Sequence, residues 1–136
     1  MRSRILMLFW IIGILFPVAF IGRFWPSFGH VFDTVFSPGW MHILMHMFLF
    51  AGLSFLVGQW LRPVSNIKIA QIVGIALLVG CLQEGIQIST YPAWPGWEAE
   101  ALDLLVDLFG AALGIFIAKR MLVRKNITTK QNQSPE

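Results

Sequence analysis

The chain has 136 residues, of which 57% are hydrophobic and only 12% are charged. Soluble domains carry about 25% charged residues, so this composition excludes an ordinary soluble domain and indicates an integral membrane protein of one compact unit. The net charge of +3 does not indicate a nucleic-acid-binding surface, because the basic residues lie at the termini and in one short loop, without interleaved aromatic residues. A single cysteine excludes a disulfide framework within the chain.

The first apolar segment runs from Ile5 to Gly22 behind a short basic start, and only Pro17 interrupts it. It is long enough to cross a bilayer, and we expect a retained membrane anchor. A signal peptide is the alternative, because a basic start and an apolar core are typical of one. However, no small-x-small cleavage site follows, and the apolar run continues beyond the proline.

The stretch that follows is too poor in apolar residues to cross the membrane and instead predicts an amphipathic helix. Phe28, Phe32 and Phe36 recur every four residues, which places them on one helical face. Trp25 and Trp40 flank this helix. Because aromatic rings prefer the lipid headgroup region, we expect an interfacial helix that lies flat in the membrane surface. The alternative is that these rings close over the end of a helix bundle.

Three further apolar segments are long enough to cross the membrane. They run from Trp40 to Trp60, from Asn66 to Thr90 and from about Glu98 to Met121. Together with the first segment they predict an all-α polytopic membrane protein, with four transmembrane helices plus the short interfacial helix, in one domain over residues 1–121. Residues 122–136 are expected to form a polar cytoplasmic tail, because they have too little apolar content to fold alone.

The basic residues predict the orientation of this bundle. In a protein with four crossings, all the basic clusters fall on one side of the membrane. They are Arg2 and Arg4, the loop with Arg62 and Lys68, and the basic residues between 119 and 130. The loop between the third and fourth crossings carries no Lys or Arg. By the positive-inside rule we expect a multi-pass membrane protein with both termini in the cytoplasm.

Polar residues within the last three crossings then fall in the outer half of the membrane, where we expect them to form one cluster. They are His42, His46, Glu84, Gln87, Glu100, Asp103 and Asp107. Ionisable residues inside a crossing are costly and indicate a functional site, or else they are structural hydrogen-bonding groups between helices. When ionised, the three acids of the last crossing repel one another unless a nearby positive charge compensates them. Histidine is the only local side chain that can do so, apart from a lipid headgroup, a metal ion or an external partner.

His42 and His46 are spaced four residues apart, so both rings can point the same way from one helix. Such a pair can bind a metal ion with nearby carboxylates, relay protons, or ligate haem or a chlorophyll-type pigment, and it can also simply neutralise buried acids. We expect no cofactor and no metal ion, because His-x-x-x-His without a further ligand motif is common by chance. We also expect no catalytic residue, because no Ser or Cys nucleophile with a base accompanies the acids.

Gly110 and Gly114 lie on the same face of the last crossing as the acids. A pair of small residues four apart predicts close packing against another helix. The third crossing offers Gly74, Gly80 and Gly85 as complements.

Three motifs carry a family resemblance: His46 within Met41–Phe48, Glu84 with Gln87, and the segment Asp103–Gly110 followed by Gly114. In this order and spacing the chain resembles the VanZ-like family of small bacterial membrane proteins, over about residues 5–120. Family members commonly carry an Asp-Lys pair just before the histidine, an Arg and a Ser ahead of the aspartate, and an Asn at position 107. This chain lacks all of these. The resemblance implies a four-helix fold in the bacterial inner membrane and, by analogy, an envelope role such as glycopeptide (teicoplanin) resistance.

Two functions follow as expectations. The first is an accessory subunit of a larger membrane complex, for example a respiratory or photosynthetic one, with lipids and other membrane subunits as partners. Six Trp and twelve Phe in so small a chain favour it. The second is an envelope protein that binds a lipid-linked or glycopeptide-type ligand in an outer polar pocket, which the presence of His46, Glu84 and Asp103 favours.

Overall fold

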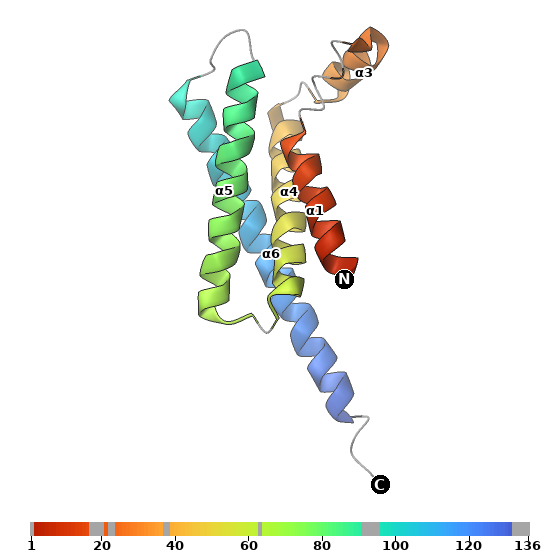
Figure 1. Ribbon diagram of the computed structural model, residues 1–136, viewed down its shortest axis with the longest axis vertical. Coiled ribbons are helices and arrows are strands. Elements are labelled where there is room, and N and C mark those ends of the chain that lie inside the picture. The colour runs from red at the N-terminus through yellow and green to blue at the C-terminus, as the bar shows by residue number, and fades with distance from the viewer. Residues whose placement is uncertain are drawn as a thin grey trace.

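The computed structural model describes residues 2–16, 21, 24–36, 39–62, 64–90 and 96–131. Within these ranges the chain forms five helices, namely α1 (Arg2–Leu15), α3 (Pro26–Phe36), α4 (Gly39–Trp60), α5 (Asn66–Thr90) and α6 (Trp97–Gln131). Four of them form a bundle, and α3 lies beyond the end of the bundle at which α4 begins (Figure 1). The prediction of an all-α protein is therefore confirmed.

Three of these helices are long and apolar enough to cross a membrane. They are Gly39–Trp60, Asn66–Ser89 and Trp97–Leu122. The remaining bundle helix, α1, has 14 residues and therefore a length of about 21 Å, against a hydrocarbon thickness of about 30 Å. It ends at Leu15 because Pro17 disfavours helical conformation in the residue before it and removes a backbone donor. This helix is the main described part of the crossing expected for residues 5–22, of which residues 17–20 and 22 lie outside the described part of the chain.

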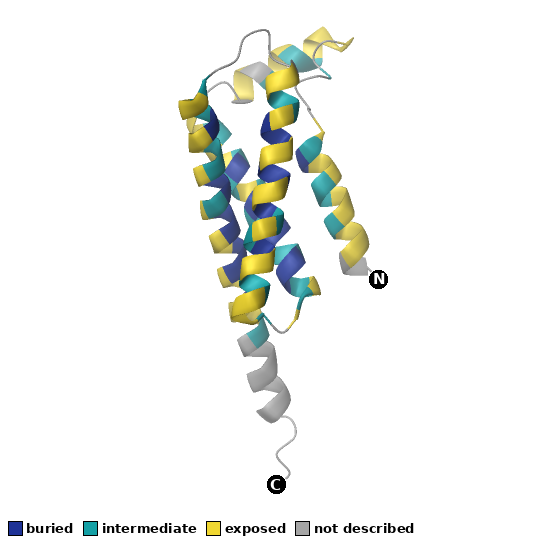
Figure 2. Ribbon diagram, turned by 60° about the vertical axis from the view of Figure 1, so that its left-hand side comes forward, coloured by how far each residue is buried: buried dark blue, intermediate teal, exposed yellow. Residues whose placement is uncertain are grey.

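The distribution of side chains is inside-out relative to a soluble protein. Large apolar side chains such as Phe9, Phe48 and Phe109 are exposed, and exposed residues follow the outer faces of the helices along their length (Figure 2). The interior holds an apolar core around Phe50 and Leu53. It also holds polar side chains that are at least nine-tenths buried, namely His46, Ser54, Gln83, Glu84, Glu100 and Asp107. This arrangement suits a surrounding of lipid, since polar groups then turn toward protein.

The closest helix pair in the bundle is that between α4 and α6, and two glycines make it possible. A Cβ atom added at Gly110 lies 2.5 Å from the carbonyl oxygen of Met47, and one added at Gly114 meets the carbonyl oxygen of Ala51. Both contacts are with the backbone of α4, so a side chain at either position forces the helices apart. The expected close packing is present, but its partner is α4 and not the glycines of α5. At Gly74 and Gly85 an added Cβ meets no described atom within 4 Å.

Helix α6 begins after Gly96, whose φ of 103° only glycine adopts readily. The helix then continues to Gln131, beyond the end expected near Met121. No Gly or Pro occurs between Gly114 and Pro135, so nothing in this stretch stops a helix. The first part of the predicted tail is therefore helical, and residues 132–136 lie outside the described part of the chain.

The predicted amphipathic helix is present as α3. It begins at Pro26, a favoured residue at the first helical position because it has no amide hydrogen to satisfy. The rings of Trp25 and Phe28 lie 6.2 Å apart and those of Phe28 and Phe32 lie 5.9 Å apart, in a row along the helix. Trp25 and Trp40 are both exposed. The side chain of Phe36 lies outside the described part of the chain.

Candidate functional site

Helices α4 and α6 begin, and α5 ends, at the same end of the bundle (Figure 1). Polar side chains of these three helices meet there. Helices α4 and α6 each contribute residues from their first turns, and α5 contributes residues from its last turns. We call the resulting group the polar cluster. It consists of His42, His46, Gln83, Glu84, Glu100, Asp103 and Asp107.

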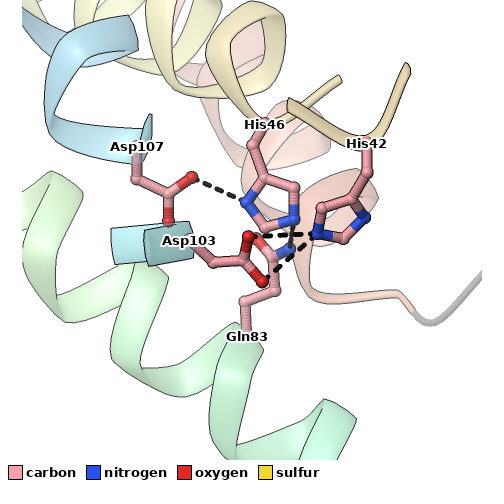
Figure 3. Close-up of polar contacts among 5 residues, drawn as sticks. All are labelled: His42, His46, Gln83, Asp103 and Asp107. Atoms are coloured by element: carbon pink, nitrogen blue, oxygen red, sulfur yellow. Dashed lines mark hydrogen bonds and ion pairs between the residues drawn. The ribbon is translucent and has the colours of Figure 1, made fainter. Parts of the chain in front are cut away.

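Two histidine–aspartate pairs connect α4 to α6. Nε2 of His42 lies 3.2 Å from both carboxylate oxygens of Asp103, and Nδ1 of His46 lies 2.8 Å from Oδ1 of Asp107 (Figure 3). The two histidines are four residues apart on α4, and the two aspartates are four residues apart on α6. Four residues are about one helical turn, so the two pairs lie one above the other between the helices. The two imidazole rings lie 4.4 Å apart between centroids.

The inner pair fixes the state of its histidine. A carboxylate only accepts hydrogen bonds, so Nδ1 of His46 must donate the hydrogen to Asp107. In the neutral ring Nε2 is then an acceptor, and it faces Nε2 of the Gln83 amide at 3.4 Å (Figure 3). This second contact is long for a hydrogen bond, whereas the contact with the aspartate is short. His46 is therefore held by α6 and only weakly engaged by α5.

A second acidic group lies beside these pairs. It consists of Glu84 on α5 and Glu100 on α6, both of which are more than nine-tenths buried. One oxygen of each, together with Oδ2 of Asp107, has no hydrogen-bond partner among the described residues. Buried polar atoms are normally partnered, so the cluster has acceptor capacity to spare.

Close approach of α5 to this group depends on Gly80. A Cβ atom at that position lies 3.0 Å from Oδ2 of Asp107 and 3.1 Å from the side chain of Leu104. A larger residue on α5 therefore displaces the aspartate that holds His46.

The polar cluster opens to the surroundings only at its outer pair. The side chain of His42 is 42% exposed and that of Asp103 is 17% exposed, against 5% and 4% for His46 and Asp107. The polar cluster thus has a buried interior behind one partly exposed histidine–aspartate pair.

Six of the seven polar residues singled out from the sequence belong to the polar cluster. The seventh, Gln87, lies half-buried on α5 and has an interaction of its own. Gln83, which was not singled out from the sequence, is the amide that reaches His46. The sequence contained a signal for this. Ile72, Ala76 and Val79 are buried on α5, and Gln83 continues their spacing of three and four residues, which marks one helical face.

The cavity that the structure describes lies at the opposite end of α4 and has a volume of about 370 Å³. Its lining comes from α4, the start of α5 and the turn between them, and it is largely apolar. It is lined by Trp60, Leu61, Gln71, Gly74, Ile75 and Leu78. No residue of the polar cluster lines it, so this cavity and the cluster are separate features.

A scan against protein-family models, a search of curated proteins and a search of solved structures each found no match to this chain. The VanZ-like resemblance therefore rests on the short motifs of the sequence.

Proposed function

We propose that this protein is an integral membrane protein with four crossings, VanZ-like in fold, that acts as an accessory subunit of a larger membrane complex. The membrane class is supported by the three long apolar helices and by the inside-out distribution of side chains. The basic residues at both termini and in the α4–α5 loop support an orientation with both termini in the cytoplasm, and the VanZ-like resemblance supports the bacterial inner membrane as the location.

The fourth crossing in this proposal is the apolar segment from Ile5 to Gly22, whose described part is mainly α1. Two contacts with α4 support its place in the bundle. The indole Nε1 of Trp10 donates a hydrogen bond of 2.8 Å to the backbone carbonyl of Leu49, and the same ring packs against Gly52. In lipid an unpaired indole N–H is costly, so this bond anchors α1 to the bundle.

The observation that carries the role as a subunit is the incompletely covered apolar face of α3. Val31 and Val35 are 61% and 45% exposed, beside the row of Phe28 and Phe32. A helix of 11 residues is only marginally stable in isolation, so α3 needs a surface against which to pack. Among the described helices it contacts α4. Another subunit that covers this face accounts for a short, aromatic helix outside the bundle.

Mild-detergent extraction with a partner analysis tests the proposal. We expect the intact chain to co-purify with other membrane subunits at fixed stoichiometry. The double variant Val31→Asn/Val35→Asn removes apolar contact from the exposed face and is expected to reduce this co-purification by more than about tenfold, the equivalent of 1.4 kcal/mol. Thr34→Ala, on the opposite polar face of α3, is the matched control and should retain the partners.

A small, monodisperse particle without partners would contradict the subunit role. It would favour the second candidate, an envelope protein that binds a lipid-linked or glycopeptide-type ligand. The joining of His46, Glu84 and Asp103 in one cluster with a partly exposed edge supports that candidate. In that case the protein should protect cells against a glycopeptide antibiotic. This resistance should be lost in Glu84→Gln and retained in the Val31→Asn/Val35→Asn variant.

A further inference from the structure

The exposed edge of the polar cluster combines two imidazoles and a carboxylate from two helices. One nitrogen or oxygen atom from each of His42, His46 and Asp103 lies within 4.8 Å of the others. We propose that these three residues bind a divalent transition-metal ion of the zinc type. This site is independent of the role as an accessory subunit, because it lies in the bundle and not on α3.

The distances suit such an ion. Ligand atoms at 2.0–2.2 Å around a tetrahedral metal lie about 3.4 Å from one another. Nε2 of His42 is already 3.2 Å from the carboxylate oxygens of Asp103, so this edge of the tetrahedron is formed. His46 completes the set from the next turn of the same helix, with its ligand atom within 4.8 Å of those of His42 and Asp103.

The inner pair prepares His46 as a ligand. Metal-binding histidines almost always donate their other ring N–H to a carboxylate or a carbonyl, which fixes the tautomer and makes the free nitrogen more basic. Asp107 does this at 2.8 Å from Nδ1. Nε2 of His46 then carries the lone pair, and its present contact with the Gln83 amide, at 3.4 Å, is weak enough to be exchanged for a metal bond.

The balance of charge favours a cation at this point. The cluster contains four carboxyl groups, those of Glu84, Glu100, Asp103 and Asp107, but only two imidazoles. Among the residues that the structure describes, the ion pairs of the cluster are the two histidine–aspartate pairs, without any lysine or arginine. Buried carboxylates need paired charge, and a divalent ion supplies it.

The donor types and the position of the site narrow the class of ion. Imidazole with carboxylate suits zinc and related first-row ions, whereas copper(I) and iron–sulfur clusters require thiolate or thioether ligands. Cys81 is exposed on α5 and is not in the group. Three protein ligands leave a fourth tetrahedral position open, and the 42% exposure of the His42 side chain provides a path for the ion. A second group, His46, Glu84 and Asp107, also lies within 4.8 Å, but all three residues are buried.

Zinc titration of the purified full chain tests the site. The protein is prepared with a tag that lacks histidine, in mild detergent, and is treated with chelator before isothermal titration with Zn²⁺ and optical titration with Co²⁺. We expect one ion per chain and the intense visible bands of tetrahedral Co²⁺. His42→Gln and Asp103→Asn should weaken binding by more than about tenfold. His30→Gln, an exposed histidine on α3, should bind as the unmodified chain does.

Helical content and elution volume show whether each variant is folded. If His42→Gln does not fold, the zinc affinity of Asp103→Asn decides the outcome. Absence of stoichiometric binding, or equal affinity in Asp103→Asn and the unmodified chain, would overturn the proposal. Loss of binding in Glu84→Gln with retention in Asp103→Asn would also overturn it, since the ion would then occupy the buried group.

Discussion

At the scale of single residues, the inner histidine–aspartate pair is the most constrained feature of the molecule. His46 and Asp107 are both almost completely buried and lie 2.8 Å apart. Removal of one partner from such a pair leaves an uncompensated polar or charged group in the interior, which typically costs about 3–5 kcal/mol. Replacement of both partners by apolar residues of similar size avoids that cost.

We therefore expect His46→Leu to lower the free energy of unfolding by about 3 kcal/mol, because Asp107 then faces the other acids without its imidazole. The double variant His46→Leu/Asp107→Leu should regain most of this loss. Denaturation in mixed micelles, followed by circular dichroism in the presence of a chelator, measures both values. His30→Leu, at an exposed position of α3, should change stability by less than about 0.5 kcal/mol. A double variant that is less stable than His46→Leu would contradict the claim that His46 and Asp107 stabilise the protein as a coupled pair.

The sequence predicted the members of the polar cluster better than their contacts. Regular spacing of four residues placed both histidines on one face of a helix, and both aspartates on another, and the structure joins these faces. The contact of Gln83 with His46 could not be predicted by spacing from Glu84 alone. It depends on which face of α5 turns inward, and this is set by contacts such as Gly80 with Asp107 that involve a different helix.

At the scale of secondary structure elements, the pair of α4 and α6 is the framework that holds the polar cluster. Gly110 and Gly114 bring the two backbones together just beyond the aspartates. The sequence predicted that this glycine face meets another helix, but not which one. Small residues signal only close approach, and α4 and α5 carry three glycines each. The glycines of α6 pack against the backbone of α4 at Met47 and Ala51. A contact with backbone atoms cannot be predicted from a pattern of side chains.

Gly114→Ala is expected to destabilise the protein by about 2 kcal/mol, because its Cβ would overlap the backbone of α4 at Ala51 and force the helices apart. Gly74→Ala is the matched control on α5, where an added Cβ meets no described atom within 4 Å. Alanine forms helix better than glycine, so the control should be neutral or more stable by up to about 1 kcal/mol. Equal effects of the two substitutions in the same micelle denaturation assay would contradict the close packing of α4 and α6.

At the scale of the whole molecule, the chain combines an apolar exterior with a polar interior at one end. Composition predicted this class because only 12% of residues are charged, about half the usual share. The number of crossings is less determined by composition. α1 ends at Leu15 where the sequence pattern continues to Gly22, since hydropathy does not register the effect of Pro17 on helical geometry. Three crossings place the two termini on opposite sides of the membrane, and four place them on the same side.

Labelling of single cysteines in intact spheroplasts with a membrane-impermeant thiol reagent tests the central claim, which is that the polar cluster lies at the outer end of a bundle with four crossings. In a Cys81→Ser background, Thr34→Cys marks α3 at the cluster end, Ser65→Cys marks the opposite end, and Ser3→Cys marks the N-terminus. We predict that Thr34→Cys is labelled from outside and that Ser65→Cys and Ser3→Cys react only after the membrane is permeabilised. Labelling of Ser3→Cys from outside would reduce the protein to three crossings, and labelling of Ser65→Cys with protection of Thr34→Cys would place the polar cluster on the cytoplasmic side and contradict the account.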